Sequence, residues 1–209
     1  MGSTLYTRYP ALEVCREELE AVIERLIEIY EAGGKLLICG NGGSAADSGH
    51  IVGELMKGFL KKRPIPQEEK ESMKATSPTL SDEILSKLQV GLPAIALPEF
   101  SAALSSAFAN DVDPDLQYAQ AVLGLGKTND MLICISTSGN AKNCVAAAEV
   151  ANALGLTTVA LTGAAGGKLK SICDMTIAVP ATETYQVQEY HLPIYHELCA
   201  QVEAHFFEK

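Results

Sequence analysis

The sequence contains no tryptophan, few other aromatic residues, and fewer basic than acidic side chains. There are 26 Asp and Glu against 16 Lys and Arg, so the formal net charge is −10. Such an acidic surface argues against nucleic acid or an anionic membrane as the main partner. The opening residues lack the positive charges and apolar run of a signal peptide, and no apolar segment approaches the length of a transmembrane helix. We therefore expect a soluble, cytoplasmic protein.

Cysteine is present, but no two cysteines have the CxxC spacing of zinc sites and redox motifs. Cys39 and Cys134 lie inside apolar runs that are typical of strands. Reduced thiols in such places behave as small hydrophobic side chains. We predict that all the cysteines are reduced core residues rather than disulfide partners or zinc ligands: Cys15, Cys39, Cys134, Cys144, Cys173 and Cys199.

Five short apolar runs stand out, and helical patterns separate most of them. The runs cover residues 35–40, 93–97, 131–137, 157–163 and 175–180. They are apolar nearly throughout, as expected of parallel strands that are covered on both faces. The helical patterns cover residues 11–35, 44–62, 140–155 and 184–207. This alternation predicts an α/β fold in one domain, residues 1–209, with a five-stranded parallel sheet flanked by helices.

Residues 65–90 interrupt the alternation of strands and helices. The segment is polar, contains Pro66 and Pro78, and includes SDEILSKL, which is typical of a short capped helix. A stretch of this length between strand units is either a lid over a site or a mobile surface insertion. The sequence leaves both interpretations open.

Two of the predicted strands end in small polar residues just before a helix. Glycine lets the backbone approach a ligand closely, and N–H groups at a helix start favour an anion. Ligands of open α/β sheets also bind at this edge. Neither loop matches GxGxxG or GxxxxGK[ST], so we expect no nucleotide cofactor. The residues expected around a phosphate monoester are Asn41, Gly42, Gly43, Ser44, Ser136, Thr137, Ser138 and Asn140.

A histidine and a glutamate are placed to share one face of the helix that follows the first glycine-rich loop. His50 and Glu54 are four residues apart, and His196 lies close to Gln188 and Glu189 on the last predicted helix. A carboxylate and an imidazole can move protons near pH 7 when their environments separate their pKa values. The same side chains would also suit a metal ion, although the HExxH pattern is absent.

Five motifs occur in an order and spacing that resemble the sugar isomerase (SIS) domain family. They are CGNGGSAADSGHIVGEL, ANDVDPD, ISTSGNAKN, ALTGAAGGKL and QEYHLPIYH. Within this family they resemble the phosphoheptose isomerases, which convert sedoheptulose 7-phosphate to D-glycero-D-manno-heptose 7-phosphate. The resemblance implies a flavodoxin-like three-layer fold, a phosphorylated sugar as substrate, and a homotetramer with active sites at subunit interfaces.

The resemblance also assigns roles to individual residues. Glu54 falls on the general base of the family and His196 on its acid–base histidine. Gln188 and Asp111 fall on further substrate-binding positions, and the serine-rich loop falls on the phosphate site. The positions that bind zinc in some members are His50, Glu54, Gln188 and His196.

The chain departs from the family pattern at a few positions. Ala141 replaces a serine of the phosphate loop, and Tyr185 replaces an aspartate. An arginine that follows the catalytic glutamate is absent, with Lys57 or Lys61 as the possible substitutes. Pro193 lies inside the last predicted helix. These changes leave the identity of the sugar open.

Two non-catalytic functions compete with the enzyme. Some SIS proteins are tetramers that bind the replication initiator, and others sense a sugar phosphate without turnover. The initiator-binding members lack the catalytic glutamate and histidine, whereas Glu54 and His196 are present here. We therefore favour an aldose–ketose isomerase.

Overall fold

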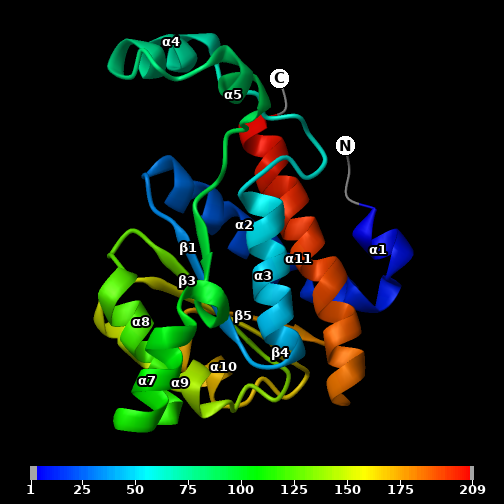
Figure 1. Cartoon of the computed structure of the whole chain (residues 1–209). Coiled ribbons are helices and arrows are strands. Elements are labelled where there is room, and N and C mark those ends of the chain that lie inside the picture. The colour runs from blue at the N-terminus through cyan, green and yellow to red at the C-terminus, as the bar shows by residue number, and fades with distance from the viewer. Residues whose placement is uncertain (1–3, 208–209) are drawn as a thin grey trace.

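The computed structural model describes residues 4–207 and is built around a parallel sheet of five strands (Figure 1). The order β2-β1-β3-β4-β5 is that of flavodoxin-like folds, in which the winding direction reverses between β1 and β3. Each predicted apolar run is confirmed as a strand, with ends that differ by at most one residue. The strands are β1 (Leu36–Gly40), β2 (Ala94–Ala96), β3 (Met131–Ser136), β4 (Thr157–Gly163) and β5 (Met175–Val179).

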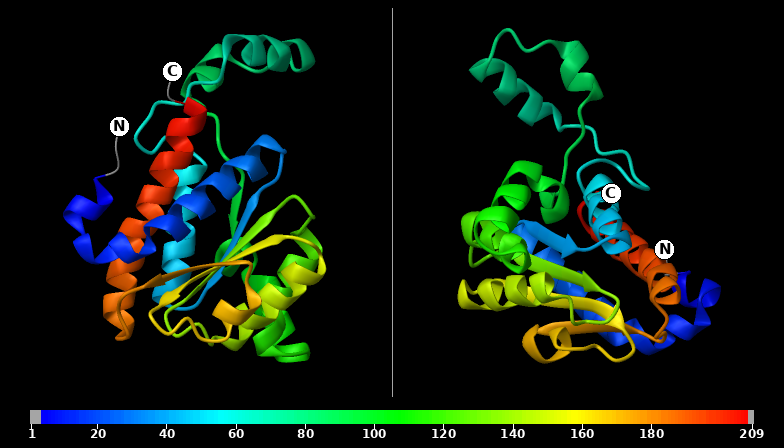
Figure 2. Two further views of the ribbon diagram at one scale, coloured as in Figure 1. Left: turned by 180° about the vertical axis from the view of Figure 1, so that it is seen from behind. Right: turned by 60° about the horizontal axis from the view of Figure 1, so that its bottom comes forward.

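Helices cover both faces of the sheet, as Figure 2 shows from two further directions. Successive residues of β1 point to opposite faces: Leu36 and Ile38 belong to one hydrophobic core, and Leu37 and Cys39 to the other. The first core is closed by α2 (Arg16–Glu31), α3 (Gly43–Leu55) and α11 (Thr184–Phe207). The second is closed by α6 (Leu97–Phe100), α8 (Gln117–Leu125), α9 (Lys142–Ala153) and α10 (Leu169–Ile172). The expected three-layer α/β fold is therefore confirmed.

The remaining helical elements lie around this sandwich. A short helix α1 (Leu5–Arg8) precedes the first layer, and α7 (Ala102–Asp111) packs beside α8. Two 3₁₀ segments, η1 (Pro10–Cys15) and η2 (Pro114–Leu116), lead into α2 and α8. Among residues 4–207, no helix is both long and apolar enough to cross a bilayer.

The predicted helix over 11–35 divides into two parts. Its first residues form the 3₁₀ segment η1, and the α-helix runs only from Arg16 to Glu31. The expected stop at the glycine pair is confirmed, because Gly33 adopts a positive φ of 76°. The predicted helix over 140–155 starts two residues late, at Lys142.

The prediction of a helix through residue 62 is wrong, because α3 ends at Leu55. Arg63 is fully buried and donates through Nη1 to the carbonyl of Leu55 at 2.6 Å and through Nη2 to that of Glu54 at 3.3 Å. The buried Glu203 of α11 accepts hydrogen bonds from the backbone N–H groups of residues 59–61. These hydrogen bonds hold residues 56–62 as a loop, although their sequence pattern predicts a helix.

Pro193 does not interrupt the last helix. The helix α11 runs without a break from Thr184 to Phe207, with Pro193 inside it. Gln188 and His196 therefore lie on one continuous helix, about 12 Å apart along its axis. A break of the helix at Pro193 therefore does not bring these two side chains to one ion.

Residues 65–90 form an arm that projects from the body of the molecule (Figure 1). It contains α4 (Gln67–Thr76) and α5 (Asp82–Lys87), and an antiparallel bridge between Pro64 and Gln89 closes its base. The predicted capped helix is confirmed, because Ser81 Oγ accepts the N–H of Ile84 at the start of α5. No residue of α4 is buried. A role of the arm as a lid stays a prediction.

The cysteines occupy the places expected from their apolar surroundings. All six lie among the described residues, where none is paired in a disulfide, and all except Cys173 are buried. Cys39 and Cys134 are neighbours on the adjacent strands β1 and β3.

Candidate functional site

An open pocket lies at the carboxyl ends of β1 and β3, where the winding direction of the sheet reverses. Its volume is about 360 Å³. Ligands bind at this place in open parallel sheets because the strand ends and helix starts leave a crevice there. The pocket is lined by Asn41, Gly42, Gly43, Ser44, Ile135, Ser136, Thr137, Ser138, Ala141, Thr184 and Gln188.

Hydrogen bonds from the helices on the second face fix the loop after β1. The side-chain amides of Asn41 and Asn143 form a reciprocal pair, with N···O distances of 2.8 and 2.9 Å. The hydroxyl of the buried Tyr118 donates to the carbonyl of Gly40 at 2.7 Å. The glycine-rich loop and the start of α3 are therefore held in place without a ligand.

The loop after β3 depends on a glycine. Gly139 has a φ of 65°, and a Cβ at this position would overlap the carbonyl oxygen of Gly166. Asn140 joins this loop to the loop after β4. Its side chain donates to the carbonyl of Ser138 at 2.8 Å and accepts the N–H of Lys168 at 3.0 Å. Only glycine at position 139 therefore lets this loop pack so closely against Gly166.

The start of α11 forms the third wall of the pocket. Thr184 and Gln188 line it, and the side chain of Gln188 lies so close to Gly43 that a Cβ there would overlap it. Hydroxyl, amide and backbone groups surround the pocket, and Ser44 and Ser136 are both buried. Such donors at a helix start are suited to a phosphate group.

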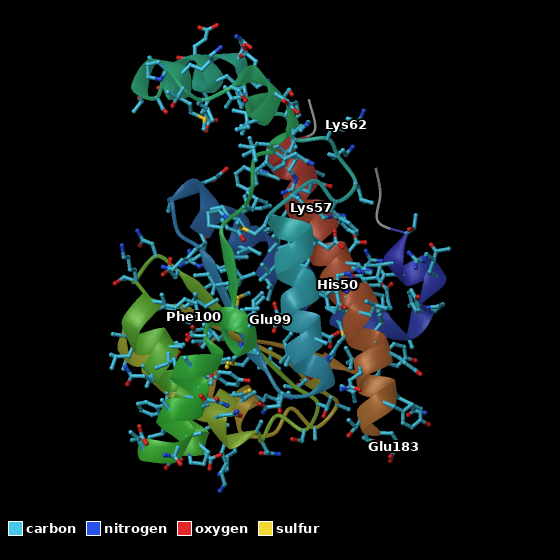
Figure 3. All side chains as sticks on the ribbon, in the orientation of Figure 1. His50, Lys57, Lys62, Glu99, Phe100 and Glu183 are labelled. Carbon is cyan, nitrogen blue, oxygen red and sulfur yellow. The ribbon has the colours of Figure 1, made fainter. Side chains whose placement is uncertain are left out.

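A cluster of three titratable side chains lies further along the same two helices. His50 Nε2 is 3.2 Å from Glu54 Oε1, and His196 Nε2 is 3.4 Å from His50 Nε2. Figure 3 shows His50 on the side of α3 next to α11, with Lys57 just beyond the end of that helix. The side chain of Glu54 is 15% exposed and that of His50 is 42% exposed. The cluster is therefore open to a small molecule while its carboxylate is partly desolvated.

The surroundings of His196 favour its neutral form. Burial lowers the pKa of the imidazole, the positive charges of His50 and Arg8 lower it further, and Glu54 opposes them. A neutral imidazole can accept a proton at one nitrogen and donate one at the other. Lys57 Nζ lies 3.4 Å from Glu54 Oε2, so Lys57 places a positive charge beside the carboxylate.

A second layer of polar groups supports His50. Its Nδ1 lies 3.0 Å from the hydroxyl oxygen of Tyr195, and that hydroxyl donates to Asp47 Oδ1 at 3.1 Å. Burial raises the pKa of the Asp47 carboxyl, an effect that the hydrogen bond from Tyr195 and the charge of His50 oppose.

The structure brings most of the residues predicted for the substrate into one pocket. Two lie elsewhere: Asn140 stands beside the pocket as a link between loops, and Asp111 ends α7, where it accepts a hydrogen bond from Asn110. The predicted residues that line the pocket are Asn41, Gly42, Gly43, Ser44, Ser136, Thr137, Ser138 and Gln188.

Several contributing residues escape the sequence analysis. Thr184 lines the pocket, Asn143 and Tyr118 hold its first loop, and Asp47 and Tyr195 contact each other behind His50. Asp47 offered the clearest signal, because it lies three residues before His50 on the same helix face. The others come from distant segments that only the fold brings together.

The four residues assigned to zinc are not assembled within one chain. His50, Glu54 and His196 lie together, but Gln188 is two turns away along α11, in the pocket. In residues 4–207, no group of three or more His, Cys, Asp or Glu side chains is arranged to hold a metal ion. The single chain therefore does not present the complete ligand set.

The fold and the pocket define a protein of the sugar isomerase class. Residues 84–163 match the family model of the SIS domain. A phosphoheptose isomerase of Helicobacter pylori is 39% identical over 199 residues, which cover 95% of this chain and 90% of the relative. Another, of Aneurinibacillus thermoaerophilus, is 38% identical over 189 residues, or 90% of this chain and 82% of the relative.

Solved structures give the same result. The phosphoheptose isomerase of Neisseria gonorrhoeae is similar with a TM-score of 0.75 and 28% identity, covering 96% of this chain and 93% of that one. That of Francisella tularensis has a TM-score of 0.76 and 27% identity, covering 95% and 92%. The chain belongs to the phosphoheptose isomerase family, and it is an isomerase.

Proposed function

We propose that this isomerase converts sedoheptulose 7-phosphate to D-glycero-D-manno-heptose 7-phosphate through a cis-enediol. The observation that carries the proposal is that α3 and α11 hold two separate groups of side chains, a phosphate-type pocket and an acid–base cluster. Ser44 lines the phosphate-type pocket at the start of α3, while Glu54 and His196 form the acid–base cluster further along α3 and on the neighbouring α11. A sugar anchored by a terminal phosphate extends its other end away from the anchor, toward such a cluster.

Glu54 is the proposed general base. Its carboxylate takes the proton from the carbon next to the carbonyl and returns it to the neighbouring carbon, so that C1 and C2 exchange oxidation states. Its side chain is only 15% exposed and lies within reach of a substrate bound next to His50. The reaction moves protons within one substrate and needs no nucleotide.

His196 is the proposed partner for the oxygen atoms. In its favoured neutral form it donates a proton to the developing enediolate oxygen and accepts one from the neighbouring hydroxyl. Lys57 adds a positive charge beside Glu54. An enzyme uses all of these groups, whereas a sensor needs the phosphate pocket alone.

The substrate phosphate is proposed to bind to Ser44 and to the serine-rich loop, residues 136–138. These hydroxyl groups donate hydrogen bonds, and the N-terminus of α3 favours an anion. Ala141 lines the pocket without a hydroxyl, so the remaining groups carry the binding.

We place the working sites in a homotetramer, at subunit interfaces. Gln188 and Asp111 both lie away from the acid–base cluster within one chain, so a second subunit is the proposed source of groups that complete it. Zinc, one ion per site, belongs to the same proposal. It would be bound only where Gln188 of a second subunit joins His50, Glu54 and His196, and the proton transfers above do not depend on it.

The test is direct conversion of sedoheptulose 7-phosphate, followed by NMR with and without added zinc. We expect the aldose product from the wild type and a loss of about 10²- to 10⁴-fold in kcat for Glu54→Gln, which keeps the shape but removes the base. Thermal stabilisation by the substrate should persist in that variant, because the phosphate pocket is intact. Stabilisation without any conversion by the wild type would instead indicate a sensor.

A further inference from the structure

One pair of amide side chains joins the two loops of the phosphate-type pocket. Asn41 lies in the loop after β1 and lines the pocket, whereas Asn143 lies in the first turn of α9, just after the loop that follows β3. Each amide donates to the oxygen of the other, at 2.8 and 2.9 Å. Asn143 itself is only 9% exposed and is not among the residues that line the pocket. Its contact with the pocket therefore runs through Asn41.

The backbone at the start of α9 fixes which way both amides point. A reciprocal pair of amides would close equally well with both groups turned over, because each amide carries an oxygen acceptor and an NH₂ donor. The backbone N–H of Cys144 removes this freedom, since it can only donate and its nitrogen lies 3.0 Å from Asn143 Oδ1. With the oxygen of Asn143 held there, Asn143 Nδ2 donates to Asn41 Oδ1, and Asn41 Nδ2 donates to Asn143 Oδ1.

This orientation leaves Asn41 with a donor that the chain itself does not use. Its NH₂ group has two hydrogens, and among the described residues only one of them has a partner, Asn143 Oδ1. The oxygen of Asn41 is occupied, because it accepts from Asn143 Nδ2 and lies 3.3 Å from the hydroxyl of the buried Tyr118. The end of this amide that has spare capacity for an anion is therefore the N–H donor.

We infer that Asn143 is a positioning residue for phosphate: it holds the amide of Asn41 so that the free N–H of Asn41 donates to an oxygen of a bound phosphate monoester. If this amide were turned over, its oxygen would face the anion and repel it. The pair also keeps the loops after β1 and β3 at a constant separation, so that both contact one phosphate group. The inference rests on the phosphate pocket of the proposed function, but not on the proposed proton transfers.

The experiment is a double-mutant cycle on the affinity of the full-length protein for inorganic phosphate, measured by calorimetry. The variants are Asn41→Ala, Asn143→Ala and the two combined. A residue that acts only through Asn41 adds nothing once the amide of Asn41 is absent. A residue that supports the pocket in another way, or contacts the phosphate itself, adds its own effect.

A control and a second variant keep the cycle decisive. Asn152→Ala is the matched control, because Asn152 lies near the other end of α9, where it donates to the carbonyl of Ile172 and accepts from the hydroxyl of Thr158. If Asn143→Ala does not fold, Asn143→Ser takes its place. A serine hydroxyl can still accept a free N–H in the first turn of α9 but is too short to hold Asn41.

We expect the dissociation constant for phosphate to rise about tenfold or more in each single variant, which corresponds to the loss of one hydrogen bond to a charged group. The double variant should match Asn41→Ala within about twofold, and Asn152→Ala should match the wild type. KM for sedoheptulose 7-phosphate should rise in parallel while kcat stays within about threefold, because the phosphate lies away from the reacting carbons.

Unchanged phosphate affinity in Asn143→Ala would overturn the inference. Effects that add in the double variant, or a wild type that does not bind phosphate, would overturn it as well. The expected cycle without turnover of sedoheptulose 7-phosphate would reject the proposed isomerisation and support the role of Asn143. Turnover by the wild type together with an unchanged Asn143→Ala would support the isomerisation and reject that role.

Discussion

His191 is a buried histidine whose two ring nitrogens have no hydrogen-bond partner within the described part of the chain. It lies on α11 between Gln188 and His196, but it faces the core. Burial lowers the pKa of its imidazole to about 4. A charged ring in this place would lose its hydration, and the backbone of Thr162, which favours the charged form, offsets only part of that loss. This residue therefore links the stability of the fold to pH.

The sign of that link follows from the two pKa values. The unfolded chain protonates His191 below about pH 6.5, whereas the folded protein does so only near pH 4, so the free energy of unfolding falls as the pH drops between them. Between pH 6.5 and 5 the loss is about 2 kcal/mol. We expect His191→Leu to lack this loss in urea unfolding at pH 7 and pH 5, measured at one protein concentration.

His205→Leu is the matched control for this prediction. His205 is exposed and pairs with Glu31 on the surface, where ion pairs contribute little. Its loss should leave the difference between pH 7 and pH 5 within about 0.5 kcal/mol of the wild type. Equal pH dependence in His191→Leu and the wild type would contradict the assignment.

At the scale of elements, the end of α3 is fixed by a buried ion pair. Arg63 Nε lies 2.7 Å from Glu203 Oε1, and both side chains are fully inaccessible. Burial alone would raise the pKa of the Glu203 carboxyl, but hydrogen bonds from the backbone of Phe59 and Leu60 and from Arg63 bring it below the usual value. The pair joins the loop after α3 to α11, so it links the two helices that carry Glu54 and His196.

Breaking this pair should destabilise the protein strongly. Arg63→Met leaves the Glu203 carboxylate buried and unpaired, and we expect the free energy of unfolding to fall by about 3–5 kcal/mol. Lys87→Met is the control, because Lys87 and Glu83 form an exposed pair on α5, and its effect should stay below about 1 kcal/mol. Urea titration of both variants measures the two changes in the free energy of unfolding. Equal changes would show that the buried ion pair stabilises the protein no more than the exposed one.

At the scale of the whole molecule, the cluster and Gln188 occupy separate places in one chain. A continuous α11 keeps them about 12 Å apart along its axis, so direct contact between the cluster and a Gln188 side chain needs two subunits. Closed symmetric oligomers often place active sites at such interfaces, because each subunit then supplies a different part.

Mixed oligomers test this arrangement. Co-expression of Glu54→Gln with Gln188→Ala should give activity several-fold above that of either variant, because some sites combine an intact cluster with an intact Gln188. Glu54→Gln with His196→Asn is the control, since both changes fall in one cluster and no mixed site is intact. Light scattering should give the mass of a tetramer. A fully active monomer, or no gain from the first pair, would contradict the proposal.

The fold followed closely from local patterns. Short continuous apolar runs such as 131–137, separated by helical patterns, are typical of buried parallel strands, so the strands and the three layers were predictable. The helix pattern failed after Leu55, where Arg63 and Glu203 meet from positions 140 residues apart. Local patterns carry no information on such a contact.

The sequence by itself determined the sheet, the two loops at its switch point, and the spacing of His50 and Glu54 on one helix face. Each of these depends on neighbouring residues or on a fixed helical period. Only the tertiary structure decided that Asn143 holds Asn41, that Tyr195 stands between Asp47 and His50, and that Gln188 is separated from His196. These relations depend on how helices pack across the sheet, and packing brings together residues that are distant in the chain.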